Sequence, residues 1–150
     1  MKLPNEVTGF YDSKLNKPPQ VDGEQFKQLC FDFASRNRGK VMDFVTPQYP
    51  TNFYYAQVEM LGNLFFILLN EHYPYLAFAS VVEFENIHFI DRPVLNEPFS
   101  SFYQVIGTGE LHVPLNQGLI KKTELNRAEL EQIAHWKPET VGQIIFNYWD

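Results

Sequence analysis

The stretch Phe53–Asn70 constrains the fold more strongly than any other part of the chain. Two apolar runs flank Gly62-Asn63, and this pair is typical of a two-residue β-hairpin turn because both residues tolerate positive φ. The predicted turn places Met60 opposite Phe65. Since side chains alternate across a strand, one face of the hairpin is expected to be apolar throughout and to belong to the core. The residues of that face are Ala56, Val58, Met60, Phe65, Ile67 and Leu69.

The second strand of this hairpin is apolar on both of its faces. Its other face carries Leu64, Phe66 and Leu68, whereas the first strand has Gln57 and Glu59 on that side. Strands that are apolar on both faces are typical of the centre of a sheet with a layer on each side. We therefore expect this strand to be central, with the N-terminal helix covering the side of Phe66.

Residues 22–38 give the clearest helical pattern. Asp22 is a suitable N-cap, and Gln25 three residues later makes the start similar to a capping box. Gly39 is expected to provide the C-cap. The apolar positions recur about every 3.6 residues, as in an amphipathic helix. Cys30 lies among them and is predicted to be a small buried residue and not a nucleophile. These positions are Phe26, Leu29, Cys30, Phe33 and Ala34.

The rest of the chain contains short strands and, in its last third, helices. Asn126 with Glu129 forms a second capping box, and Leu125 is expected to pack on Leu130 as a hydrophobic staple. The order of helix, strands and helices predicts an α+β fold: a single domain, residues 1–150, with a mainly antiparallel sheet, an N-terminal helix and C-terminal helices. The other expected segments are strands at 7–11, 40–46, 75–84 and 87–90, turns near 85–86 and at 107–111, an ambiguous segment at 99–106 and a short helix from 140.

The charge of the chain limits the class of partner. Lys and Arg number 12 against 18 Asp and Glu, so the formal net charge is −6. Nucleic acids and anionic membranes are bound through basic patches, so the sequence predicts neither nucleic acid nor membrane as a partner. A basic protein partner fits this charge, because opposite charges accelerate encounter.

The cysteine content and the apolar runs indicate a compartment. The single cysteine excludes an intramolecular disulfide, which favours a reducing environment. No apolar run has the length that a signal peptide or a membrane span requires. A cytoplasmic protein is therefore expected.

No motif in the sequence names a reaction. The GxGxxG, P-loop and GxSxG patterns are absent, and no cofactor is predicted. The most notable polar cluster is Glu83, Glu85, His88 and Asp91. It can be interpreted as a metal or acid–base site, as the solvated side of an edge strand, or as an acidic recognition patch. In the last case Glu83, Glu85 and Asp91 are the candidate partner-binding residues.

The segment WKPETVGQIIFNYWD, residues 136–150, resembles the closing segment of small uncharacterised cytoplasmic proteins from Gram-positive bacteria. Some of those are thought to be immunity proteins for secreted polymorphic toxins. The length, acidity and expected α+β domain of the chain are also similar to those of this group. The chain lacks the Asn-Gly-Gly type of turn expected in the SUKH immunity superfamily. The resemblance implies a toxin-neutralising function and assigns no role to a particular residue.

Three functions are compatible with these features. The first is a non-enzymatic protein-binding module, an immunity or inhibitor protein that neutralises a basic toxin by occluding it, with aromatic anchors and acidic steering residues. The alternative is a small-molecule-binding or regulatory domain with an aromatic-lined pocket between sheet and helices. The third is an enzyme that uses Glu83, Glu85 and His88. A homodimer is compatible with all three.

Overall fold

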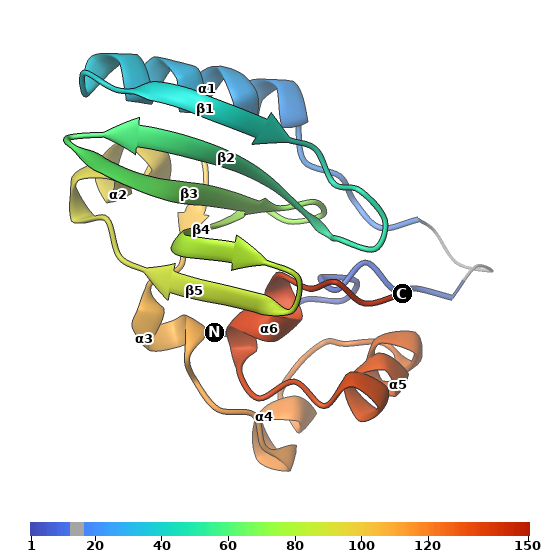
Figure 1. Cartoon of the computed structure of the whole chain (residues 1–150). Coiled ribbons are helices and arrows are strands. Elements are labelled where there is room, and N and C mark those ends of the chain that lie inside the picture. The colour runs from blue at the N-terminus through green and yellow to red at the C-terminus, as the bar shows by residue number, and fades with distance from the viewer. Residues whose placement is uncertain (13–16) are drawn as a thin grey trace.

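Five strands that follow one another in the sequence form the centre of the molecule (Figure 1). The computed structural model describes residues 1–12 and 17–150. The strands are β1 (Lys40–Val45), β2 (Phe53–Met60), β3 (Asn63–Asn70), β4 (Tyr75–Glu83), β5 (Asn86–Ile90) and the short β6 (Gln104–Val105). The helices are α1 (Gly23–Arg36), α2 (Pro93–Ser100), α3 (Thr108–Leu111), α4 (Gln117–Lys121), α5 (Arg127–Trp136) and α6 (Val141–Ile145).

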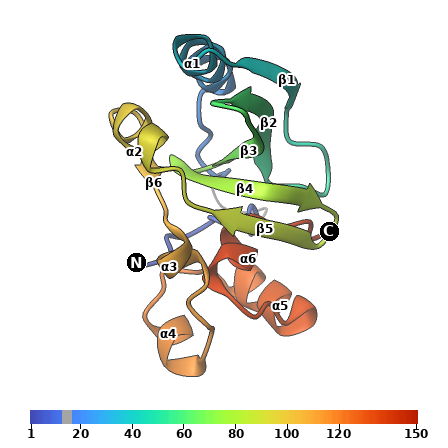
Figure 2. The ribbon, with the colours of Figure 1, turned by 60° about the vertical axis from the view of Figure 1, so that its left-hand side comes forward.

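The sheet has the order β1-β2-β3-β4-β5, in which every neighbouring pair is antiparallel. β6 pairs in parallel with the start of β4. Figure 2 shows α1 and α2 on one side of the sheet and α3 to α6 gathered near β5 on the other. The predicted α+β fold, with a mainly antiparallel sheet, an N-terminal helix and C-terminal helices, is confirmed. Among the described residues, no helix reaches the length and apolarity that a bilayer crossing demands.

Each face of the sheet has its own apolar core. The core toward α1 and α2 contains Phe26, Cys30, Phe33, Ala56, Val58, Phe65, Ile67, Phe78, Leu95 and Phe99. The core toward the C-terminal helices contains Leu3, Val7, Phe53, Leu68, Ala77, Phe89, Leu111, Ile144, Ile145 and Phe146. Cys30 is fully buried, as predicted, and burial raises the pKa of its thiol.

The turn between β2 and β3 lies one residue earlier than predicted. Leu61 and Gly62 take positive φ values of 53° and 76°, as the favoured two-residue hairpin turn requires at both central positions. Met60 therefore pairs with Asn63 and not with Phe65, so the predicted register is wrong. The Asn63 amide donates to Leu61 O (3.2 Å), which stabilises this turn. Because the pairing moves by two residues, every side chain keeps its face, and the predicted apolar face is buried.

β3 occupies the centre of the sheet, as its two apolar faces predicted. The predicted cover of its second face is wrong, because α1 packs on the side of Val58 and not on the side of Phe66. That second face is covered by α6 and the N-terminal segment, whose side chains form one cluster with Leu68. The cover stops short of the β2–β3 turn, where Leu64 is 55% exposed.

The ends of α1 set its place against the sheet. Asp22 caps the start by accepting a hydrogen bond from the backbone N–H of Gln25 (3.1 Å). At the other end Arg38 takes the left-handed conformation, with φ of 55°. The C-cap is Asn37 and not the predicted Gly39, although the backbone N–H of Gly39 donates to Ala34 O (2.7 Å) in the last turn of α1. Gly39 also passes very close to β2. A Cβ at this position would lie 2.1 Å from the carbonyl oxygen of Glu59, so only glycine fits.

Several segments outside the sheet differ from their predictions. Residues 7–11 form no strand. The segment 99–106 contains the end of α2 and the two-residue β6, and the predicted turn at 107–111 is the short helix α3. The capping box of α5 is confirmed, with both of its hydrogen bonds present. Leu130, which was predicted to pack on Leu125, is 39% exposed.

Buried asparagines join both ends of the chain to the sheet. The Asn70 amide group donates to the carbonyl oxygens of Val7 (3.0 Å) and Ile145 (2.7 Å). Its oxygen accepts from two backbone N–H groups just after β3. Asn52, before β2, donates to the same Ile145 oxygen (3.0 Å) and accepts from the N–H of Asn147 (2.8 Å). The segments around residues 7 and 145 therefore lie together at the end of β3.

A buried carboxylate fastens α5 to the N-terminal segment. Glu129 is fully buried, and one of its oxygens accepts from the backbone N–H groups of Glu6 (2.7 Å) and Asn126 (3.1 Å). The other accepts from the N–H (2.9 Å) and the hydroxyl (2.6 Å) of Thr8. Burying a carboxylate is costly unless it is hydrogen-bonded, and these donors meet that need.

Candidate functional site

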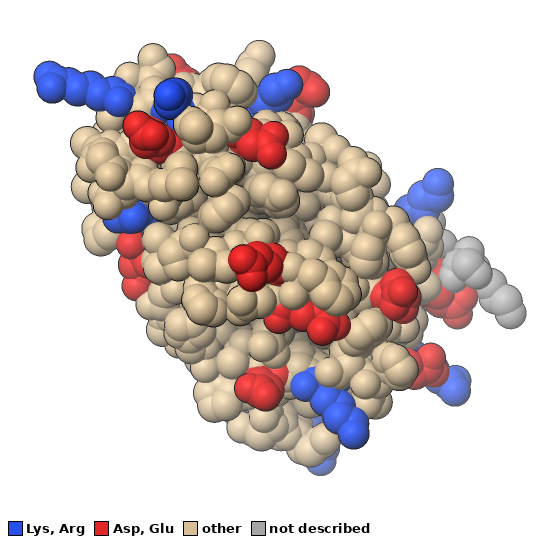
Figure 3. All heavy atoms as spheres, in the orientation of Figure 1, with Lys and Arg blue, Asp and Glu red and all other residues tan. Residues whose placement is uncertain are grey.

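The tip of the β4–β5 hairpin, residues 83–86, combines an exposed aromatic ring with carboxylates. Glu83 ends β4 and Glu85 lies in the turn with φ of 56°, and both side chains are exposed. Phe84 between them is 65% exposed. In Figure 3, acidic side chains spread across the middle of the face, while most Lys and Arg side chains lie toward its edges. The hairpin tip therefore presents an apolar ring in acidic surroundings.

A row of rings connects the exposed Phe84 to the core. Its ring contacts Tyr148 edge-on, with centroids 5.2 Å apart, and Tyr148 contacts Phe53 in the same way at 5.5 Å. Phe53 is buried. Burial, followed by the effects of Tyr55 and Glu83, raises the pKa of Tyr148 to about 12. The phenol is therefore neutral at physiological pH and keeps its O–H donor.

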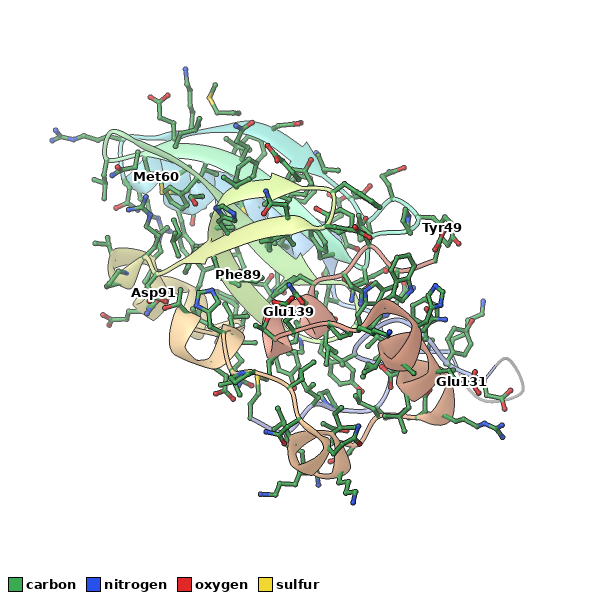
Figure 4. The ribbon with its side chains drawn as sticks, turned by 60° about the horizontal axis from the view of Figure 1, so that its bottom comes forward. Tyr49, Met60, Phe89, Asp91, Glu131 and Glu139 are labelled. Carbon is green, nitrogen blue, oxygen red and sulfur yellow. The ribbon has the colours of Figure 1, made fainter. Side chains whose placement is uncertain are left out.

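A pocket of about 300 Å³, which we call the C-terminal pocket, lies beside the hairpin tip. Phe89 of β5 and Phe146 line it, and their ring centroids are 5.7 Å apart. Both tryptophans of the chain, Trp136 and Trp149, also line it. Figure 4 looks toward this side of the molecule, with Phe89 on β5 and Glu139 just before α6. The pocket thus lies between the sheet and the C-terminal helices and is rich in aromatic rings.

Close packing fixes the shape of this pocket. Gly142 at the start of α6 lies against β5, where a Cβ would come within 2.7 Å of the Phe89 ring. A side chain at this position would therefore push α6 away from the sheet. The Gln143 side chain accepts from the backbone N–H of Glu139 (2.6 Å), which holds the segment leading into α6. The pocket is therefore built into the folded chain and does not depend on a bound molecule.

The charges that line the C-terminal pocket are two carboxylates and one ammonium group. Glu85 and Glu139 are the acids and Lys137 is the base, and all three are exposed. Lys137 follows α5 in the left-handed conformation, with φ of 52°. The indole N–H of Trp136 donates to Gln132 (2.9 Å), so this ring already has an acceptor. The pocket therefore has a net negative charge and aromatic walls.

The structure separates the four polar residues that the sequence grouped together. Glu83 and Glu85 lie at the hairpin tip, whereas Asp91 follows the far end of β5, about 17 Å away at the rise of an antiparallel strand. The Asp91 carboxylate accepts from the Thr108 hydroxyl (2.6 Å) and backbone N–H (2.9 Å). These hydrogen bonds, the side-chain one first, lower the pKa of Asp91. Asp91 therefore holds the start of α3.

The metal and acid–base interpretations gain no support from this arrangement. His88 is exposed and pairs with Val81 across the hairpin. Within residues 1–12 and 17–150, no three His, Cys, Asp or Glu side chains come together as metal ligands. Glu83, Glu85 and His88 are all exposed, so they do not form a cleft of the kind in which acid–base residues usually lie.

Sequence reasoning proposed Glu83 and Glu85 as partner-binding residues and, as an alternative, an aromatic-lined pocket between sheet and helices, but it assigned no residues to that pocket. The segment 136–149 supplies most of the lining of the pocket. From the sequence, this segment was assigned a short helix and a family resemblance, but no role in a binding site. One signal was available. Both tryptophans of the chain lie in this segment, Trp136 close to Pro138 and Trp149 directly after Tyr148. Trp and Tyr are enriched in binding sites, which makes such a concentration informative.

Comparison of the chain with protein-family models, curated proteins and solved structures finds no match. The function must therefore be argued from the hairpin tip and the C-terminal pocket themselves.

Proposed function

We propose that this chain is a non-enzymatic protein-binding module, an immunity or inhibitor protein that neutralises a basic toxin by covering it. The observation that carries the proposal is the supported ring of Phe84 between Glu83 and Glu85. Hot spots of protein interfaces are typically aromatic anchors held in place before binding and surrounded by polar groups. The hairpin tip meets this description.

Charge supports a basic partner. The chain has a net charge of −6, and acidic side chains lie across the face shown in Figure 3. Complementary charge accelerates encounter and suppresses wrong partners. Glu83 and Glu85 carry this part of the proposal, and Glu139 at the pocket joins them. Asp91 contributes less to the proposed interface, because its carboxylate is bonded to Thr108 at the other end of β5.

The resemblance of residues 136–150 to toxin-immunity proteins is a further support for the proposal. That segment lines the pocket beside the hairpin tip. An inhibitor that binds with this surface blocks its target by occlusion and needs no catalytic residue. We infer that the cytoplasm of the producing cell is where the chain protects against a toxin.

The test compares two charge-reversed variants of equal net charge. Glu83→Lys with Glu85→Lys changes the hairpin tip, whereas Asp32→Lys with Glu97→Lys changes exposed acids on α1 and α2. Each variant is immobilised and exposed to lysate and secreted proteins of the source organism. Co-expression of the captured protein in a sensitive host then tests for rescue of growth.

The expected result is a basic protein that binds the wild type and the α1–α2 variant and is lost from the hairpin-tip variant. Binding should weaken steeply with salt, and the wild-type chain should rescue growth. Phe84→Ala should also abolish capture, whereas Phe31→Ala, which removes a ring 49% exposed on α1, should not. Capture that survives reversal of Glu83 and Glu85 at low salt would contradict the proposal.

The C-terminal pocket favours a second candidate, a small-molecule-binding or regulatory domain. Its volume of about 300 Å³ is at the lower limit of known ligand cavities, and it lies between sheet and helices. A metabolite that raises the melting temperature in a dose-dependent way would support this function. The increase should disappear in a variant whose pocket is altered, such as Tyr148→Ala.

A further inference from the structure

We propose that the C-terminal pocket receives the guanidinium group of an arginine side chain from the partner. This inference rests on the proposed function and identifies the chemistry that the pocket recognises. The observations that carry it are the aromatic lining, the carboxylates of Glu85 and Glu139, and the size of the pocket. The segment 136–149 then acts together with the hairpin tip in one interface.

The charges at the pocket select a cation. Two carboxylates and one ammonium group line it, and Glu83 lies close enough to raise the pKa of Tyr148. An anion would face repulsion from Glu85 and Glu139. A purely apolar group would leave the polar side chains of the lining without partners. A single positive charge brings the pocket close to neutrality.

The rings at the pocket select guanidinium over ammonium. A guanidinium group is planar, weakly hydrated and stacks on aromatic faces, whereas an ammonium group is compact and strongly hydrated. Tryptophan is the best aromatic partner for a cation, and two tryptophans line this pocket. The indole N–H of Trp136 is already bonded to Gln132, so its remaining interaction is through the ring. Glu85 and Glu139 offer the acceptors that a planar fork of N–H donors uses.

The pocket also suits a side chain that arrives from outside. Its volume of about 300 Å³ suits a side chain or a small ligand better than a large cofactor. Phe84 precedes Glu85, which lines the pocket, and its ring contacts Tyr148, which also lines it. A partner that packs on Phe84 therefore places its next side chain at the pocket.

The two tryptophans give the experiment a specific signal. Both tryptophans of the chain line the pocket, so intrinsic fluorescence reports on this site. Trp149 also borders a second pocket beside Asn52 and His72, and the Glu85 and Glu139 variant below distinguishes the two. The full chain is titrated with acetyl-Gly-Arg-Gly-amide and with the matched peptide in which citrulline replaces arginine. Citrulline keeps the shape and removes the charge. A peptide with lysine in the same place separates guanidinium from ammonium.

The arginine peptide is expected to change the fluorescence with a dissociation constant on the order of 1–10 mM, as befits a single side chain. The citrulline peptide should bind at least about tenfold more weakly, and the lysine peptide about two- to fivefold more weakly. Glu85→Gln with Glu139→Gln should weaken arginine binding about fivefold or more. The control Asp32→Asn with Glu97→Gln should leave it unchanged.

Lys137 provides a variant with the opposite expectation. Lys137→Asn removes the competing positive charge, and asparagine tolerates the left-handed conformation of this position. Arginine binding should tighten about two- to fivefold. Equal affinity for the arginine and citrulline peptides would overturn the proposal, as would no saturable signal, or affinity unchanged in the Glu85 and Glu139 variant.

The two proposals can fail separately. If the arginine peptide binds and no basic protein is captured, the pocket chemistry stands and the inhibitor function fails. If a basic protein is captured and its affinity is indifferent to Glu85→Gln with Glu139→Gln, the inhibitor function stands and the arginine pocket fails.

Discussion

The buried carboxylate of Glu129 offers the most stringent test of how the C-terminal helices are held. Each of its oxygens accepts two hydrogen bonds, from Glu6 and Asn126 on one side and from Thr8 on the other. In Glu129→Gln, one oxygen becomes an NH₂ group that cannot accept. The Thr8 hydroxyl can rotate and accept from that group, so the amide should turn its nitrogen toward Thr8. The backbone N–H of Thr8 is then left without an acceptor inside the core.

The magnitude of the effect follows from this geometry. A buried N–H without a partner costs about 1–3 kcal/mol, and the remaining bonds lose the strengthening that a charged acceptor provides. Removing the desolvation cost of the buried carboxylate offsets part of this loss. The net expectation is a fall of about 2 kcal/mol in the free energy of unfolding, measured by urea denaturation.

The matched control lies on the same helix. Glu131→Gln removes an exposed carboxylate whose partner is Arg127 at 3.2 Å, and it should cost less than about 0.5 kcal/mol. Amide hydrogen exchange at Thr8 should accelerate in Glu129→Gln and stay unchanged in Glu131→Gln. If the two variants unfold at the same urea concentration, the buried carboxylate does not fasten the N-terminal segment in the way described.

Two further predictions concern Gly39 and Asp91. Gly39→Ala should destabilise the fold by about 3 kcal/mol or more, because its Cβ would collide with the backbone of β2. Thermal unfolding should show this loss. The control Gly109→Ala, whose Cβ meets nothing within 4 Å, should be neutral or slightly stabilising. Asp91→Asn should reduce stability at neutral pH, since the hydrogen bonds from Thr108 favour the carboxylate. Because the pKa of Asp91 is lowered in the folded chain, its contribution to the free energy of unfolding is complete above the ordinary pKa of 3.8 and is lost as the pH falls through the folded pKa. The variant and the wild type should therefore converge in urea denaturation at low pH.

The sheet was predictable because its signal is local. The alternation in Phe53–Asn70 fixed which side chains face the core, and a displacement of the turn by one residue left that result intact. What failed was the choice of turn residues, since Leu61 takes a conformation that costs a leucine more than a glycine or an asparagine. Its side chain is 59% exposed, so no burial is lost there.

Other misses arise from context that the sequence does not display. The strand predicted at 87–90 ends as expected, but helix α2 was not predicted. It begins at Pro93, and a proline is favourable in the first turn of a helix as well as after a strand. Gly39 was predicted to be a cap because glycine is common at helix ends. Its closeness to Glu59 depends on how α1 packs on the sheet, which the sequence does not show. The C-terminal pocket joins β5 to the segment 136–149, and a contact across that distance in sequence leaves no local pattern.

The Asn70 side chain joins the segment that leads into the proposed binding site to a segment near the start of the sequence. During synthesis Val7 is available early, whereas Ile145 leaves the ribosome only after the sheet and α5 have been made. The side-chain amides of Asn70 and Asn52 both donate to these two carbonyl groups, so both gain their full set of partners only once Ile145 has been made. A nascent chain with a finished sheet still lacks the wall of rings that residues 146–149 supply. The pocket therefore forms only after residues 136–149 have packed against the sheet.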